Sequence, residues 1–391
     1  MAGIDRAGLL DFTRALVRIP SVFDPSRGLN EAPAADLVAE RMRGFGWTPV
    51  VQEVAPGRPN VHAVIEGGRT GPTLLFEGHT DVVTEGDPAA WSHPPFGAEI
   101  VAGRLYGRGA ADMKAGVGAM LYAIQALASG GPFPGRVVVA ALCDEEGLML
   151  GVKAFVRAGH AAGVDAAIVC EPEGGEVCVT QKGALRLRVT AAGKMAHGAM
   201  PQHGHNPIPP LARFVERAAA VEAELQRERG EHPQLGWDYI TPTVLAAGTA
   251  GQANVIPASA WAALDVRTTP GLDHRALVAR LRAQAPGLEV EVVEDRPPTE
   301  TSPSHPVVQA VMEAHRRVTG LEPVLGGVPG ATDGTILWRD ARVPIVIYGP
   351  GGKWIAHQVD EYVEVSDLAR AADVYLEAAR LFLGLGAGGG Y

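Results

Sequence analysis

The chain has 391 residues, a formal net charge of −10 at pH 7, 47% hydrophobic residues and 20% charged residues. This length is too great for one ordinary hydrophobic core, so the sequence predicts two domains. The composition is typical of a soluble globular protein, and the acidic charge without a basic face argues against nucleic acid or an anionic membrane as the main partner. We therefore expect a small-molecule substrate.

Residues 1–20 carry charged side chains at helical spacing among apolar ones, which predicts an amphipathic helix and not a signal peptide. No uncharged apolar run approaches the roughly 20 residues that span a bilayer. The three cysteines, Cys143, Cys170 and Cys178, form no Cys-x-x-Cys motif, and two lie in apolar strand-like runs. They indicate reduced core residues in a cytoplasmic protein.

Helical and strand-like patterns alternate in the first part of the chain and return near its end. The expected helices cover residues 9–18, 34–44 and 114–128, and the expected strands cover residues 73–76, 136–142, 166–170 and 343–348. This alternation predicts an α/β domain with a mostly parallel central sheet.

The middle of the chain has a different order of elements. We expect a strand at 185–191, a helix at 207–227, strands at 241–247 and 259–267, a helix at 273–285 and a strand at 288–294. This β-α-β-β-α-β order is the ferredoxin-like unit. We therefore predict a larger domain in two parts, residues 1–181 and 296–391, interrupted by an inserted domain at 182–295. The glycine-rich stretch 384–391 is the only low-complexity segment.

Residues that bind metals well follow the predicted strands of the larger domain. They are His79 and Asp81 after the first strand, Asp144, Glu145 and Glu146 after the second, Glu171 after the third and His357 beyond the fourth, with Asp112 just before a helix. The loops at the carboxyl ends of strands form the ligand crevice of an open α/β sheet. These side chains are therefore expected to converge at one edge.

Two imidazoles and a surplus of carboxylates, without a thiolate, suit Zn²⁺, although Mn²⁺ or Co²⁺ fits the same donors. These donors are more numerous than the ligands that one metal ion can bind. If Asp112 bridges two ions, Glu146 and His357 complete one site, while His79 and Glu171 complete the other. Three carboxylates and one bridging hydroxide would balance the four positive charges, as a buried cluster needs.

Glu145 is left over, and a carboxylate beside a metal-bound water is what a general base requires. Asp81 is expected to support His79 by accepting its second ring N–H.

Each of these sequence patterns, taken alone, also has a simpler interpretation. His79 and Asp81 can be loop polar residues, "DEEG" can be a turn, and Asp112 can cap the helix that begins near Lys114.

The sequence resembles the co-catalytic zinc amidohydrolases, which include acetylornithine deacetylase, succinyl-diaminopimelate desuccinylase, aminoacylase and glutamate carboxypeptidase. The motifs that carry the resemblance are "GHTDVV", "LYGRGAADMKAG", "DEEG", "EP" at Glu171, "HGAMPQHGHNPI", "ANVIP", "DVR" and "HQVDEYV". They cover nearly the whole chain. The resemblance implies a zinc-hydrolase catalytic domain interrupted by a lid domain that commonly mediates dimerisation.

For the site, the resemblance implies that two Zn²⁺ bind, with Co²⁺ or Mn²⁺ able to substitute. The implied metal ligands are His79, Asp112 as the bridge, Glu146, Glu171 and His357. It also implies that Glu145 is the base, that Asp81 orients His79, and that the peptide between Asp112 and Met113 is cis.

Four further residues have an ordinary interpretation and a second one that the resemblance supplies. His197 is by default a structural histidine, but its equivalent in the family comes from the partner subunit's lid and stabilises the oxyanion. Asn254 is either a turn residue or a substrate contact. Arg267 suits the capture of a substrate carboxylate. Thr332 lies in a glycine-rich stretch that the family places near the substrate.

The expected activity is hydrolysis of the amide bond of an N-acyl-L-amino acid by a di-zinc-activated water. The glutamate at position 171 favours this deacylase interpretation within the family. A zinc carboxypeptidase or dipeptidase is the alternative, and a non-catalytic binding relative is a third possibility. We expect a cytoplasmic homodimer formed through the lid domain.

Overall fold

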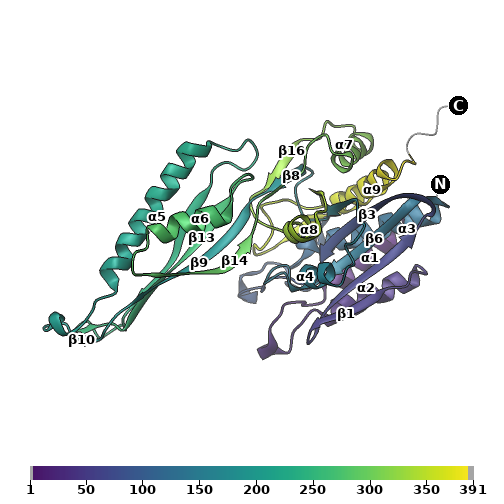
Figure 1. Cartoon of the computed structure of the whole chain (residues 1–391). Coiled ribbons are helices and arrows are strands. Elements are labelled where there is room, and N and C mark those ends of the chain that lie inside the picture. The colour runs from purple at the N-terminus through teal and green to yellow at the C-terminus, as the bar shows by residue number, and fades with distance from the viewer. Residues whose placement is uncertain (1–2, 386–391) are drawn as a thin grey trace. The chain divides into compact units, whose positions relative to one another are not determined.

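The computed structural model describes residues 3–385, so the part of the glycine-rich stretch from residue 386 onward lies outside the described residues. The described residues divide into two compact units (Figure 1). The first unit comprises the chain up to Val179, Thr301–Gly326 and the chain from Thr332. The second comprises Thr180–Glu300 and Gly327–Ala331.

The largest sheet in the described residues has nine strands. They are β1 (Val50–Ala55), β2 (Arg58–Glu66), β3 (Gly68–His79), β6 (Phe133–Leu142), β7 (Ala166–Val169), β8 (Val177–Gln181), β15 (Thr299–Glu300), β16 (Leu325–Val328) and β17 (Ile345–Ile347). Their order is β1-β2-β6-β3-β7-β17-β8-β15, and β16 also pairs with β8. The central strands β6, β3, β7 and β17 run parallel, whereas pairing toward both ends is antiparallel. The predicted α/β fold with parallel central strands is confirmed.

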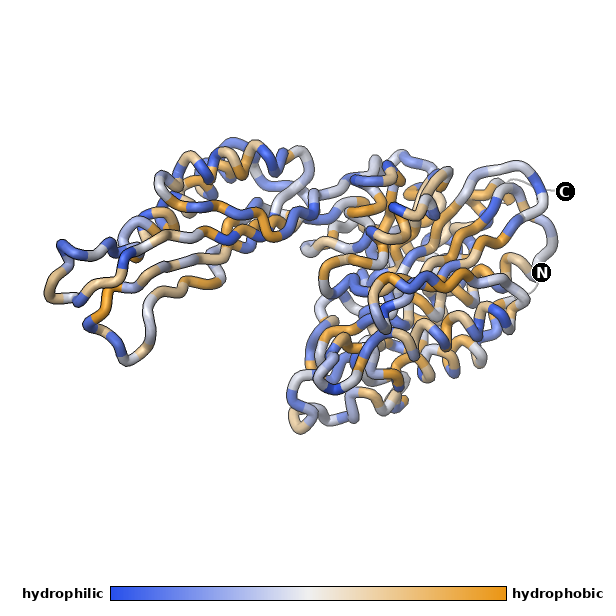
Figure 2. Tube along the Cα trace, turned by 60° about the horizontal axis from the view of Figure 1, so that its bottom comes forward, coloured by the Kyte–Doolittle hydropathy of each residue, from blue (hydrophilic) through white to orange (hydrophobic). Residues whose placement is uncertain are grey.

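Helices cover this sheet on both faces. The helices of the first unit are α1 (Arg6–Val17), α2 (Ala32–Gly44), α3 (Ala115–Ser129), α4 (Leu150–Arg157), α7 (Pro306–Thr319), α8 (Gly334–Ala341) and α9 (Val365–Phe382). The sheet and the helices α1, α2, α3, α7 and α9 share one hydrophobic core that includes Leu74 and Phe76. Leu75 lies outside that core, because successive side chains of a strand face opposite sides. Figure 2 shows the apolar strands as orange runs along the tube.

The second unit has the predicted β-α-β-β-α-β order. Its elements are β9 (Gly183–Ala192), α5 (Ile208–Arg229), β11 (Tyr239–Ala247), β13 (Ser259–Thr268), α6 (His274–Ala283) and β14 (Glu289–Arg296). The strands form an antiparallel sheet in the order β11-β13-β9-β14. Every second residue of β13 is buried in a core shared with α5 and α6. Its role as a lid or dimerisation domain remains a prediction.

The chain enters and leaves the second unit through two paired strands. Gln181 of β8 lies opposite Thr299 of β15, and the Thr301 N–H donates to the Val179 carbonyl at 2.8 Å. The predicted limits of the insertion, 182 and 295, lie within the observed Thr180–Glu300. The prediction did not include residues 327–331. They group with the second unit, where the Lys182 N–H donates to the Val328 carbonyl at 3.0 Å.

Short elements escaped the sequence patterns because runs of two to five residues are too short to show a periodicity. They are β4 (Ile100–Val101), β5 (Arg104–Tyr106) and β18 (Tyr362–Glu364), which form a small sheet, the pair β10 (Ala196–His197) and β12 (Val255–Ile256), and the short helical turns η1 (Pro25–Arg27), η2 (Pro88–Ala90), η3 (Ala110–Lys114) and η4 (Pro201–His203). In the part of the chain that the structure describes, no helix combines the length and apolarity needed to cross a membrane.

Candidate metal centre

The predicted ligands lie at the carboxyl ends of neighbouring strands. His79 ends β3, residues 144–146 follow β6, Glu171 follows β7, and the segment that reaches His357 follows β17. These four strands are adjacent and parallel, in the order β6-β3-β7-β17. The structure therefore brings the predicted ligands of the first unit to one edge of the sheet, where open α/β sheets bind ligands.

The carboxylate of Asp112 lies between two imidazoles. Its Oδ1 is 3.1 Å from His79 Nε2, and its Oδ2 is 3.2 Å from His357 Nε2. Glu171 Oε1 lies 3.5 Å from the same His79 nitrogen, and Glu146 Oε1 lies 2.8 Å from the same His357 nitrogen. Each oxygen of Asp112 thus faces its own imidazole and carboxylate pair, which is the arrangement that a bridging ligand needs.

Asp112 does not cap the following helix. It lies in η3 with non-helical backbone angles, φ −110° and ψ 98°, and its peptide bond to Met113 is cis, as the resemblance implied. In the described chain, no side-chain hydrogen bond caps α3, which begins at Ala115. The helix-cap interpretation of Asp112 is therefore wrong, and its carboxylate is directed at His79 and His357 instead.

Asp81 connects one imidazole to the segment that carries the predicted base. Its backbone carbonyl lies 3.0 Å from His79 Nδ1, nearer than its carboxylate at 3.6 Å. The carboxylate instead accepts the backbone N–H groups of Glu145, at 3.2 Å, and Glu146, at 3.0 Å. The sequence predicted a carboxylate support for His79. In the structure the Asp81 carbonyl is the group nearest His79 Nδ1, and the Asp81 carboxylate bonds the backbone of Glu145 and Glu146.

The pKa values at the centre reflect crowded buried carboxylates. Burial, and then the neighbouring Asp112, raises the pKa of Glu171 to about 8. Burial also raises the pKa of Glu145 well above its ordinary value. Hydrogen bonds to the carboxylates of Asp112 and Glu146 raise the pKa of His357 to about 10. This concentration of negative charge, with nitrogen and oxygen donors and no thiolate, fits divalent cations of the Zn²⁺ type.

A buried ion network supports the segment that contains Glu145, the predicted base. Arg58 Nη2 lies 2.6 Å from Asp144 Oδ1 and 2.5 Å from Glu31 Oε1. Asp144 Oδ2 accepts the N–H groups of Leu148 and Leu150, both at 3.1 Å. Asp144 directly precedes Glu145, so this network holds the turn after β6. Sequence reasoning missed Arg58 and Glu31, because no local pattern links residues so far apart in the chain.

The three predicted residues of the second unit do not come together within that unit. His197 ends β10 opposite Val255, and the Asn254 carbonyl accepts the Gly198 N–H at 2.7 Å, so His197 and Asn254 are neighbours. Arg267 lies near the far end of β13, where its Nε is 2.7 Å from Asp265 Oδ1. Eight residues of strand separate Ser259 from Arg267, which corresponds to about 26 Å. One small substrate cannot contact both groups of one chain.

Thr332 is buried just before α8, where its Oγ1 accepts the Gly334 N–H at 3.2 Å.

A further acidic cluster, Glu173, Glu176 and Cys178, lies close to the segment of Glu171. The ammonium of Lys353 already lies 2.9 Å from Glu173 and 2.8 Å from Glu176. The Lys353 ammonium offsets one of the two carboxylate charges, so this cluster already holds a cation.

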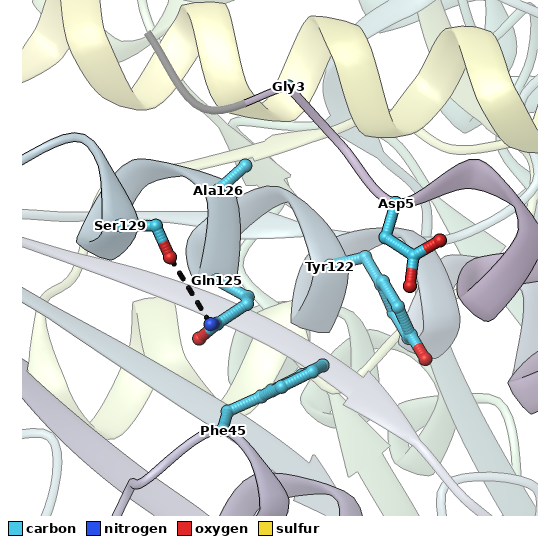
Figure 3. A pocket seen from close by; sticks show the side chains of 7 residues that line it. All are labelled: Gly3, Asp5, Phe45, Tyr122, Gln125, Ala126 and Ser129. Carbon is cyan, nitrogen blue, oxygen red and sulfur yellow. Dashed lines mark hydrogen bonds between the residues drawn. The ribbon is translucent and has the colours of Figure 1, made fainter.

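A separate pocket lies between the start of α1 and α3 (Figure 3). Its lining includes Asp5, Phe45, Tyr122 and Gln125, and Figure 3 shows the hydrogen bond between Gln125 and Ser129. Asp5 caps α1 by accepting the Gly8 N–H. No residue predicted from the sequence to act at the site lines this pocket, so the candidate site is the edge of the sheet at His79.

The α/β fold and the paired imidazole and carboxylate groups define the class of co-catalytic metallohydrolases. A sequence profile of Peptidase family M20/M25/M40 matches residues 75–381. The chain belongs to this family.

Close relatives extend over nearly the whole chain. A succinyl-diaminopimelate desuccinylase of Methylobacterium radiotolerans is 35% identical over 388 residues, covering 94% of each chain. The enzyme of the same name from Rhodospirillum centenum is 34% identical, covering 93% of this chain and 94% of its own.

Solved structures share the fold at lower identity. An M20 family metallo-carboxypeptidase of Sulfolobus solfataricus has a TM-score of 0.78 at 21% identity, covering 96% of this chain and 99% of its own. A dinuclear metal-binding M20 peptidase of Bacillus subtilis has a TM-score of 0.73 at 18% identity, covering 97% of this chain and 98% of its own.

Proposed function

We propose that this protein hydrolyses the amide bond of N-acyl-L-amino acids, in the manner of a deacetylase or desuccinylase. The observation that carries the proposal is the Asp112 carboxylate, whose two oxygens each face one imidazole, with Glu145 nearby and buried. The relatives at 34–35% identity are named desuccinylases, which supports an N-acyl substrate.

We propose that two Zn²⁺ bind, and that Co²⁺ or Mn²⁺ can replace them. Asp112 would bridge them, with His79 and Glu171 holding one and Glu146 and His357 the other. Bound there, Zn²⁺ acts as a Lewis acid and makes water more acidic. The Bacillus subtilis relative is described as dinuclear, which agrees with two ions.

In the proposed mechanism, Glu145 takes the proton of the attacking water and later delivers it to the departing amine. Burial raises the pKa of Glu145 above its ordinary value in the metal-free chain, which favours the uptake of a proton by this carboxylate. Asp81 holds Glu145 through its backbone N–H, which fixes the base relative to the ligands. The partner subunit's His197 would donate to the oxyanion of the attacked carbonyl.

We propose a homodimer in which two chains build each site. Within one second unit, His197 and Asn254 lie in or next to the β10–β12 pair, which precedes Ser259 in the chain, whereas Arg267 lies about 26 Å along β13 from Ser259. We infer that one chain does not supply both groups to a small substrate. We assign Arg267 and Thr332 to the chain that binds the metals. The partner's His197 and the partner's Asn254 complete the site.

Arg267 would bind the substrate's carboxylate through its guanidinium. In the structure Arg267 pairs with Asp265 on the same strand, at a distance of 2.7 Å, and a substrate carboxylate would compete with this pair. We also propose a cytoplasmic location, because the three cysteines are buried and unpaired.

A zinc carboxypeptidase or dipeptidase is the second candidate function, because a structural neighbour is a metallo-carboxypeptidase. A non-catalytic binding relative is the third candidate. An assay with N-acetyl amino acids, N-succinyl amino acids and dipeptides, each with added Zn²⁺, Co²⁺ or Mn²⁺, separates them. We expect turnover of N-acyl amino acids. Turnover confined to dipeptides would favour the peptidase, and turnover of none would favour the binding relative.

A further inference from the structure

We propose that the buried ion pair between Arg108 and Glu361 is a positioning device that sets the spacing between Asp112 and His357, and thereby mainly the affinity for the metal ion that His357 would hold. The inference rests on the proposed function, because it assigns these two residues to the same metal centre. Neither residue is among the expected ligands.

The pair is fully enclosed and well formed. Arg108 Nη1 lies 2.5 Å from Glu361 Oε2, and the side chains are 3% and 0% exposed. The Arg108 guanidinium also lies over the ring of Trp91, 5.2 Å from its centroid. A guanidinium fork has several donors in a fixed plane, so it can bond the Glu361 carboxylate and a second acceptor at once.

Each member of the pair belongs to the segment of one ligand and bonds the backbone of the other ligand. Arg108 lies four residues before Asp112, and its Nη2 donates to the His357 carbonyl at 3.2 Å. Glu361 lies four residues after His357, and its Oε1 accepts the N–H groups of Ala111 and Asp112, both at 3.0 Å. The contacts are therefore reciprocal, and they join two segments that are about 250 residues apart in the sequence.

The position of His79 and Glu171 depends less on the Arg108–Glu361 pair than the position of Asp112 and His357 does. His79 is the last residue of the central strand β3, and Glu171 follows β7, where the Cys170 N–H donates to the Glu77 carbonyl at 2.9 Å. The sheet itself fixes these two residues. Asp112 and His357 lie in irregular backbone, with non-helical angles at Asp112 and a positive φ of 66° at His357. Their relative position depends on side-chain contacts instead.

Titration of the metal-free protein with Zn²⁺ or Co²⁺ in a calorimeter tests the inference. We expect Glu361→Gln to weaken the binding event that involves His357 by about 10–100-fold, as is typical when the residues behind metal ligands are changed. The other event should weaken less, because the sheet fixes its ligands His79 and Glu171 and only the bridging Asp112 is disturbed. The amide introduced by Glu361→Gln would keep one acceptor for the Asp112 N–H, so Glu361→Ala should weaken the event that involves His357 further. Arg108→Lys should act in the same direction, because an ammonium cannot bond both acceptors as the fork does.

Glu364→Gln is the matched control. Glu364 lies three residues from Glu361 and pairs with Arg104 at 2.8 Å, and this pair is partly exposed, with side chains that are 35% and 42% exposed. Both metal affinities should stay at the parent value in this variant. Saturating metal should restore turnover in Glu361→Gln with an unchanged KM, a split that a general loss of folding would not produce.

Three outcomes decide against the inference. Parent-like affinities for both ions in folded Glu361→Gln and Arg108→Lys would overturn it and leave the proposed function intact. An equal loss at both sites, together with a lower Tm of the metal-free variants, would assign the pair a structural role only. A parent protein that binds no metal would overturn both this inference and the proposed function.

Discussion

The backbone N–H of Glu145 donates to the carboxylate of Asp81 at 3.2 Å. This contact links the proposed base to the residue whose carbonyl faces the His79 ring. A change at Asp81 should therefore affect the position of the base as well as the metal ligand. The first two predictions separate these effects.

For Asp81→Ala, we expect a fall of about 10–100-fold in kcat or in metal affinity, without loss of the site, as is typical for residues that support metal ligands. The carbonyl contact to His79 remains in this variant, since it comes from the backbone. The loss should therefore appear more in kcat at saturating metal than in metal affinity. Calorimetric metal titration and steady-state kinetics on the same preparation check this, and unchanged kinetics would contradict it.

Glu145→Gln should bind metal as the parent does and lose activity by orders of magnitude, because the amide cannot accept a proton. The shape of the side chain and the backbone contact to Asp81 are preserved. Metal content and turnover of an N-acyl amino acid are the measurements. Near-normal turnover would remove Glu145 from the role of base.

Arg58→Met should lower the free energy of unfolding by about 3–5 kcal/mol, because it leaves the buried carboxylates of Glu31 and Asp144 without their shared cation. Denaturant unfolding of the metal-free protein measures this loss. The control is Arg6→Met, which breaks the exposed pair of Arg6 with Asp373, at 2.7 Å, and should cost less than about 1 kcal/mol. Equal losses of unfolding free energy in the two variants would show that the buried Arg58 network stabilises the fold no more than the exposed pair does.

His62 predicts a pH dependence of stability in the first unit. Burial, and then the neighbouring His160, lowers the pKa of His62 to about 4, below the 6.5 of an unfolded histidine. The unfolded chain therefore binds this proton first, so the contribution of His62 is complete above about pH 6.5 and is lost as the pH falls toward 4.

His62→Phe should flatten the decline in stability between pH 6.5 and 4 by about 2 kcal/mol, since the aromatic ring can still pack against Phe155 without binding a proton. Unfolding free energies across this range measure the effect. His203→Asn, at an exposed histidine, serves as the control and should leave the slope unchanged. If the unfolding free energy falls with pH equally in the parent and in His62→Phe, His62 is not the source of the pH dependence.

Mixing two inactive variants tests the shared site. Glu145→Ala and His197→Ala chains should each be inactive alone. If two chains related by two-fold symmetry share the site, refolding or exchanging an equal mixture should restore about a quarter of the parent's activity, because half of the dimers then contain one intact site. Activity that stays at the level of the separate variants would place His197 and Glu145 in the same site of one chain, or His197 outside the site.

The sequence was sufficient to predict that the expected ligands of the first unit lie together, because of how parallel strands are arranged. His79 and Glu171 each follow an apolar run, and parallel strands put such positions at one edge. The strand order itself could not be read from the patterns, and neither could the antiparallel strands at the ends of the sheet.

The buried ion pairs behind the site were also not predictable from the sequence. Arg108 and Glu361 are 253 residues apart, and in a linear sequence each is an ordinary charged residue. Their partners depend on the path of the folded chain. For the same reason, the sequence patterns could not show that His197 lies in the β10–β12 pair while Arg267 lies near the end of β13.

Because β8 pairs with β15, the chain leaves the large sheet to form the second unit and returns to the sheet beside the strand that it left. In terms of chain topology, its main segment from Thr180 to Glu300 is an enlarged hairpin connection. Such a segment can be gained, exchanged or shortened over evolutionary time without rethreading any strand of the sheet that holds the metal ligands. With Arg267 and Asn254 as the proposed substrate contacts in this segment, substrate preference can diversify there while the residues around His79 are inherited unchanged.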